Sequence, residues 1–102
     1  MKIPEHYSHY PCHDYFSSSL ASEGLWDEQA QCWTIEPSER VLENASAEFL
    51  QVGRPGVDGI GFGYRKEIPG FWAFFPMECE FQLLAPTIMR FVDQWNAGEI
   101  KL

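Results

Sequence analysis

The sequence lacks most of the features that reveal a secreted, membrane or redox protein. It has only three cysteines, an odd number with no regular spacing, at positions 12, 32 and 79. Its longest uncharged apolar run, residues 70–77, falls far short of the roughly 18–20 residues that a membrane span needs. No apolar secretory segment follows the opening MKIPEHYSHYP. These absences predict a soluble protein of the reducing cytoplasm, with no membrane partner.

Basic residues are also scarce. Seven Lys and Arg face fifteen Asp and Glu, for a net charge of −8. Residues 1–53 hold nine acids and two bases, a net of −7, whereas residues 54–102 hold six acids and five bases. Nucleic acids and anionic lipids require clustered Lys and Arg, so we expect neither as a partner. The charge favours a basic protein partner, attracted at a salt-dependent rate, unless it only keeps the protein soluble.

No catalytic motif is present, and we expect no catalytic residues, no cofactor and no enzymatic activity. All three histidines lie within the first thirteen residues, which leaves the rest of the chain without its usual proton carrier. The run Gly59-Ile60-Gly61-Phe62-Gly63 alternates within an apolar strand pattern and does not open a helix, as a dinucleotide-binding loop would. We interpret these glycines as room for an aromatic side chain, Trp72 or Phe74, against the backbone.

One cluster of metal-ligand types stands near the start, where His6, His9, Cys12 and His13 form the pattern HxxHxxCH. Imidazole and thiolate are good zinc ligands. However, Pro11 interrupts the segment, and no second ligand pair follows at the spacing of a zinc finger. We therefore expect no metal site and interpret the segment as a strap over the aromatic core, with metal binding as the third functional alternative.

The length of 102 residues predicts one domain, residues 1–102, and the aromatic content of 16% allows a dense core. The first half is expected to contain a helix over 14–23 that ends at Gly24, a strand over 31–36, and a helical turn over 37–44. In that turn Val41 and Leu42 would face inward. Residues 47–52 fit either a helix or a strand, and we favour the strand.

The second half has clearer signals. Strands are predicted over 60–65, 71–75 and 81–84, with turns at 54–56, 58–59, 69–70 and 76–78, each of which contains Pro or Gly. The strand 71–75 is apolar throughout, as expected of a strand covered on both faces. Short connections of this kind favour an antiparallel meander.

The final element is an amphipathic helix. Ile88, Phe91, Val92 and Trp95 follow helical spacing, with Pro86 in the first turn, Gly98 just beyond the end and Trp95 as the expected main anchor. The predicted fold class is α+β, a mostly antiparallel β-meander of four to six strands with a C-terminal amphipathic helix packed on one face.

Three segments of this half resemble the SUKH superfamily: GRPGVDGIGFGYR, GFWAFFPMECEFQLLAPT and FVDQWNAGEI. The superfamily includes bacterial immunity proteins that neutralise toxins, often nucleases, and a fungal regulator of cell-wall synthesis. The resemblance covers residues 47–102 and is weaker upstream, where DYFSSSLASEGLW is similar to the early helix of the family. It implies no shared catalytic residues.

The resemblance and the charge together imply a non-enzymatic protein-binding domain. The first hypothesis is an immunity protein that binds and occludes a basic toxin, such as a nuclease domain. The runner-up is a regulatory module that binds a host protein. The carboxylates expected to contact the partner are those of Asp27, Glu28, Glu36, Glu39 and Glu43.

Overall fold

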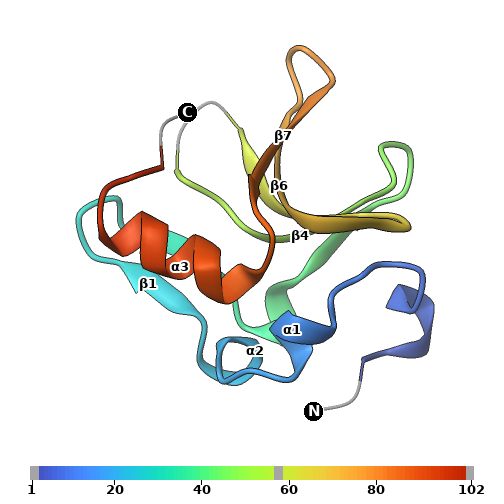
Figure 1. Cartoon of the computed structure of the whole chain (residues 1–102), viewed down its shortest axis with the longest axis horizontal. Helices are drawn as coiled ribbons and strands as arrows, with labels where there is room; N and C mark the ends of the chain where they lie inside the picture. The colour runs from blue at the N-terminus through green and yellow to red at the C-terminus, as the bar shows by residue number, and fades with distance from the viewer. Residues whose placement is uncertain (1–2, 57–58, 101–102) are drawn as a thin grey trace.

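The computed structural model describes residues 3–56 and 59–100, which form one five-stranded antiparallel sheet, one two-stranded sheet and short helices (Figure 1). The large sheet has the order β3-β4-β5-β6-β7, a simple meander. Its strands are β3 (Leu42–Asn44), β4 (Phe49–Gly53), β5 (Gly61–Arg65), β6 (Ile68–Phe75) and β7 (Glu80–Ala85). The small sheet pairs β1 (Leu25–Asp27) with β2 (Cys32–Ile35). The predicted α+β class and the antiparallel meander are confirmed.

The helices are short except the last. They are α1 (His13–Phe16), α2 (Leu20–Glu23) and α3 (Ile88–Asn96), with 3-10 turns η1 (Glu5–Tyr7) and η2 (Ser38–Arg40). Figure 1 shows α1, α2 and α3 gathered along one side of the large sheet. We call the sheet surface on that side the inner face and the opposite surface the outer face.

The core lies between the inner face and α3. Phe91 of α3 packs against Phe62 and Phe71, with ring centroids 4.9 and 4.7 Å apart. Ile88 and Phe91 are fully buried, whereas Trp95 is only partly buried at the side of the same cluster. The C-terminal helix is therefore confirmed, but its main anchors are Ile88 and Phe91 in place of Trp95.

The carboxylate of Asp14 joins three elements. Its Oδ1 accepts hydrogen bonds from the hydroxyl of Tyr64 on β5 at 2.8 Å and from the Tyr15 amide at 3.0 Å. Its Oδ2 accepts from the amide of Ile88, the first residue of α3, at 2.8 Å. That amide has no partner within its own helix, so Asp14 caps α3 from a distant part of the chain. Burial and the neighbouring Asp14 charge raise the pKa of Tyr64 far above its usual range, which keeps its hydroxyl a donor.

We expect Asp14→Ala to lower the free energy of unfolding by about 2–3 kcal/mol, because the buried Tyr64 hydroxyl and the Ile88 amide lose their acceptor. Urea unfolding at neutral pH measures the change. The control is Asp93→Ala, which removes an exposed carboxylate from α3 itself. Equal stability of the two variants would contradict the role of Asp14 as a link between α1, β5 and α3.

Three sequence predictions for the first half need correction. The helix over 14–23 is broken into α1 and α2, because the Ser18 hydroxyl bonds the Tyr15 carbonyl and the Leu20 amide. The strand β1 was not predicted. Residues 37–44 hold only one 3-10 turn before β3, in which Leu42 is exposed and only Val41 faces the core. Gly24, with φ +69°, ends α2 as predicted, and the strands over 31–36 and 47–52 are confirmed as β2 and β4.

In the second half the predicted strands are confirmed, but one turn and the place of Pro86 in the helix are wrong. Pro69 and Gly70 lie inside β6, and the chain instead reverses at Lys66-Glu67, where Glu67 has φ +59°. Pro86 precedes the helix, because Thr87 is the N-cap and its side chain accepts from the Arg90 amide. The other turn at 58–59 includes Asp58, which lies outside the described residues. Gly98, with φ +74°, ends α3 as predicted.

The glycines of β5 make room for neighbours other than the expected Trp72 or Phe74. A Cβ on Gly61 would meet the side chain of Gln51, and a Cβ on Gly63 would overlap the carbonyl of Leu50. Both neighbours belong to β4. Gly63 permits the close approach of the β4 and β5 backbones, whereas Gly61 leaves room for the Gln51 side chain.

Candidate functional site

The outer face of the large sheet carries a row of paired residues that crosses all five strands. We call it the apolar row after its side chains Leu42, Trp72 and Leu83, although Gln51 and Gly63 lie between Leu42 and Trp72. The register pairs Leu42 with Gln51, Gln51 with Gly63, Gly63 with Trp72, and Trp72 with Leu83. Directly paired residues point to the same face of a sheet, so this row is continuous. Its two ends are exposed, Leu42 by 60% and Leu83 by 54%.

Aromatic rings support the centre of this face. Phe49, Phe74 and Phe81 form one cluster, with centroids 5.0–5.7 Å apart. The guanidinium carbon of Arg65 lies 4.1 Å from the Phe81 centroid and 4.8 Å from that of Trp72. These distances are those of cation–π contacts. Arg65 thus covers the aromatic rings and fixes the centre of the outer face.

No helix of residues 3–56 and 59–100 packs over the outer face, in contrast to the inner face. Apolar residues that stay exposed in one area of a monomer commonly mark a protein–protein contact. The candidate interface therefore consists of the outer-face residues Leu42, Gln51, Arg65, Ile68, Trp72 and Leu83.

The carboxylates expected to contact a partner do not form a single cluster. Asp27 and Glu28 lie at the turn of the β1–β2 hairpin, whereas Glu39 and Glu43 lie on η2 and β3. Figure 1 shows the β1–β2 hairpin and the green loop that joins β3 to β4 on opposite sides of the molecule. Glu28, Glu39 and Glu43 are exposed and Asp27 is partly so. The Glu43 carboxylate also accepts a hydrogen bond from the Tyr10 hydroxyl at 2.8 Å.

Glu36 corrects the expected set, because it is a buried structural residue. Its side chain is 2% exposed, and its Oε1 accepts a hydrogen bond from the Arg54 guanidinium at 2.6 Å. Its backbone carbonyl accepts from the hydroxyl of Tyr15 at 2.6 Å. A paired carboxylate at this depth has neither the exposure nor the free charge to attract a partner.

The four side chains of the N-terminal His/Cys cluster do not converge. Cys12 is fully buried and its thiol donates to the Tyr7 carbonyl, whereas His6, His9 and His13 are exposed. Burial raises the pKa of the Cys12 thiol to about 11, which keeps it protonated at neutral pH and unsuited to bind a cation. Among the described residues there is no group of three His, Cys, Asp or Glu placed to hold a metal ion.

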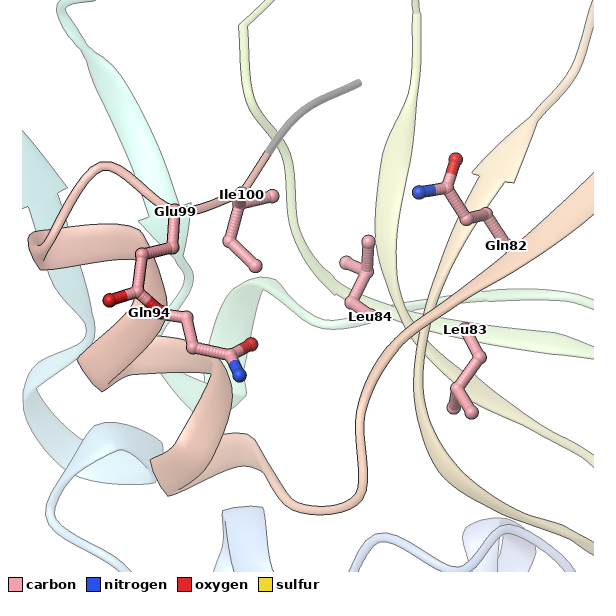
Figure 2. A pocket seen from close by; sticks show the side chains of 6 residues that line it. All are labelled: Gln82, Leu83, Leu84, Gln94, Glu99 and Ile100. Atoms are coloured by element: carbon pink, nitrogen blue, oxygen red, sulfur yellow. The ribbon is translucent and has the colours of Figure 1, made fainter.

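A shallow cleft lies between β7 and the C-terminal end of α3 (Figure 2). Its volume is about 290 Å³, and its lining comprises Gln82, Leu83, Leu84, Gln94, Glu99 and Ile100. In Figure 2, Leu84 points toward the helix side and Leu83 toward the other side of the strand. Of the described lining residues only Glu99 carries an acidic or basic side chain, so this lining offers no pair of groups for acid–base catalysis.

Sequence reasoning missed the outer face as a candidate interface. The signal was present in part, since Leu42 and Leu83 are apolar residues in short strands. Without the register, however, the sequence predicts Leu42 in a helical turn and Leu83 in a strand over 81–84 whose faces it does not assign. Strand pairing alone brings these residues and Trp72 into one row.

None of the helices within the described ranges is both long and apolar enough to cross a membrane. Comparison of the chain with protein-family models, with curated proteins and with solved structures gives no match.

Proposed function

We propose that this chain is a non-enzymatic protein-binding domain whose outer sheet face docks onto a basic protein. The observation that carries the proposal is the apolar row from Leu42 through Trp72 to Leu83, whose two ends are exposed and whose Trp72 is partly buried, on a face that no described helix covers. A sheet whose aromatic rings already pack against one another presents such a surface without a large cost in side-chain ordering.

The charge of the chain supports a basic partner. Contact and attraction are separate contributions: the apolar row supplies the contact, and the net charge of −8 supplies the long-range attraction. Glu28 and Glu39 are exposed and contribute to this field. Together with the resemblance to SUKH immunity proteins, this favours a toxin domain, such as a nuclease, as the partner. A host protein in a regulatory complex is the second candidate.

The first experiment is capture with the tagged protein at low salt from its native lysate, with mass spectrometry of the bound proteins. A basic toxin or nuclease domain that elutes as the salt concentration rises would support the immunity function. A host protein of another kind would favour the regulatory module. An acidic partner that is retained at high salt would contradict the electrostatic part of the proposal.

With the captured partner purified, we expect Leu83→Asp to weaken binding at least tenfold, because it places a charge at one end of the apolar row. The control is Met77→Asp, at an 85% exposed residue in the β6–β7 turn. Surface plasmon resonance measures both. Equal effects of the two variants would remove the outer face from the interface.

The same assay separates attraction from contact. We expect the double variant Glu28→Lys/Glu39→Lys to slow association about tenfold at low salt and to flatten its salt dependence, with little change in the dissociation rate. The net charge becomes −4, since each change adds two positive charges to −8. Unchanged association kinetics would show that the acidic surface does not steer the partner.

A further inference from the structure

A second cavity, away from the outer sheet face, lies between the β1–β2 hairpin, the end of η2 and the residue that follows β4. Its volume is about 430 Å³, within the usual range for small-molecule sites. Its described lining combines two indoles, two guanidiniums and two small polar groups, from Trp26, Trp33, Arg40, Arg54, Gln31 and Cys32.

The two indoles form a corner. Trp26 and Trp33 face each other across the β1–β2 hairpin as directly paired residues, and their rings lie 5.2 Å apart with planes at 76°. Trp33 packs closely over Gly24, where an added Cβ would come within 2.8 Å of its ring. Trp26 remains 42% exposed. A flat ring can therefore lie on one indole with its edge against the other.

Backbone pairing fixes Arg54 beside this corner. Two backbone hydrogen bonds join the end of β4 to the end of β2. The Glu36 amide donates to the Val52 carbonyl at 2.6 Å, and the Arg54 amide donates to the Thr34 carbonyl at 3.2 Å. The buried Glu36 carboxylate then holds one guanidinium nitrogen of Arg54 at 2.6 Å. This contact restrains the Arg54 side chain before any ligand arrives, which lowers the ordering cost of binding.

The charges around the cavity favour a ligand with no more than one negative charge. Arg40 and Arg54 bring two positive charges, and Glu36 neutralises one of them. The nearby Asp27 carboxylate is turned to its own hairpin, where it accepts from the amides of Gln29 and Ala30. Its charge still opposes a dianion. A carboxylate matches the planar fork of a guanidinium and carries a single charge.

We propose that this cavity binds a small aromatic monocarboxylate, whose ring lies on the Trp26–Trp33 corner and whose carboxylate contacts Arg40 and Arg54. The site is separate from the proposed protein interface on the outer face, and either can fail without the other. Binding here requires no catalytic group and no metal.

The test uses phenylacetate as the probe, with isothermal titration calorimetry and tryptophan fluorescence as readouts on the full chain. Three matched compounds separate the contributions: acetate lacks the ring, 2-phenylethanol lacks the charge, and phenyl phosphate carries a second charge. We expect saturable binding of phenylacetate, and a Kd at least tenfold higher for each of the other three. Tighter binding of phenyl phosphate would overturn the choice of a monoanion.

Variants locate the binding. Arg40→Gln and Trp26→Ala change exposed side chains, so both should fold as judged by circular dichroism, and each should raise the phenylacetate Kd at least tenfold. Arg90→Gln, which removes an exposed arginine from α3, is the control and should leave the Kd unchanged. Absence of saturation with the unaltered protein, or equal binding by Arg40→Gln and Arg90→Gln, would overturn the proposal.

Discussion

Replacement of Gly63 by alanine is expected to lower the free energy of unfolding by about 4 kcal/mol or more, which is large for a single methyl group. The added Cβ would overlap the Leu50 carbonyl on the neighbouring strand. Because the obstacle is backbone and not a flexible side chain, β4 and β5 must separate to accommodate it. Such a loss approaches the whole stability of a small domain, about 5–15 kcal/mol.

Urea unfolding followed by circular dichroism measures this change, with hydrogen exchange of β4 and β5 amides as a second readout. The control is Gly98→Ala, where an added Cβ meets nothing among the described residues within 4 Å. At Gly98 only the positive φ of +74° opposes alanine, at a cost of about 1 kcal/mol. If Gly63→Ala were no less stable than Gly98→Ala, the close approach of β4 and β5 would be wrong.

Phe91→Ala is expected to cost about 3–5 kcal/mol, because it empties the centre of the core between α3 and the inner face. The ring is fully buried and contacts Phe62, Phe71 and Trp95, with centroids 4.9, 4.7 and 5.9 Å away. Loss of this ring therefore leaves a cavity that the rigid sheet cannot close.

Two further variants of α3 give the comparison. Trp95→Ala should cost about half as much as Phe91→Ala, since the indole is only partly buried at the edge of the cluster. Met89→Ala, at a 51% exposed residue, should stay within about 0.5 kcal/mol of the unaltered protein. Guanidinium chloride unfolding ranks the three, and a larger effect for Trp95 than for Phe91 would restore Trp95 as the main anchor.

The parts of the fold that the sequence predicted are those with a local cause. Helical spacing of Ile88, Phe91 and Trp95 gave the C-terminal helix, and alternation from Ile60 to Arg65 gave β5. The errors arose where a distant contact competes with a local preference. Pro69-Gly70 has the chemistry of a turn, yet it lies inside β6, because β6 pairs with β5 on both sides of it, at Ile68 and at Trp72.

The candidate sites were less predictable than the fold. Of the five expected carboxylates, Glu36 is the one that is buried, with an ion-pair partner, Arg54, eighteen residues away in the chain. Nothing in the local sequence distinguishes a buried, paired carboxylate from an exposed one. The corner of Trp26 and Trp33 likewise exists only because β1 pairs with β2, and β1 was not predicted.

The sequence by itself determined two kinds of property. Its composition set the net charge of −8 and the aromatic core, and its residue order set the antiparallel meander and the final amphipathic helix. These depend on residue type and short-range periodicity, which are local. The tertiary structure alone decided which faces stay open and which charges are neutralised. Strand register and the packing of α1 and α3 on one side of the sheet determine which faces are open and which charges are neutralised. Both depend on contacts between residues far apart in the chain.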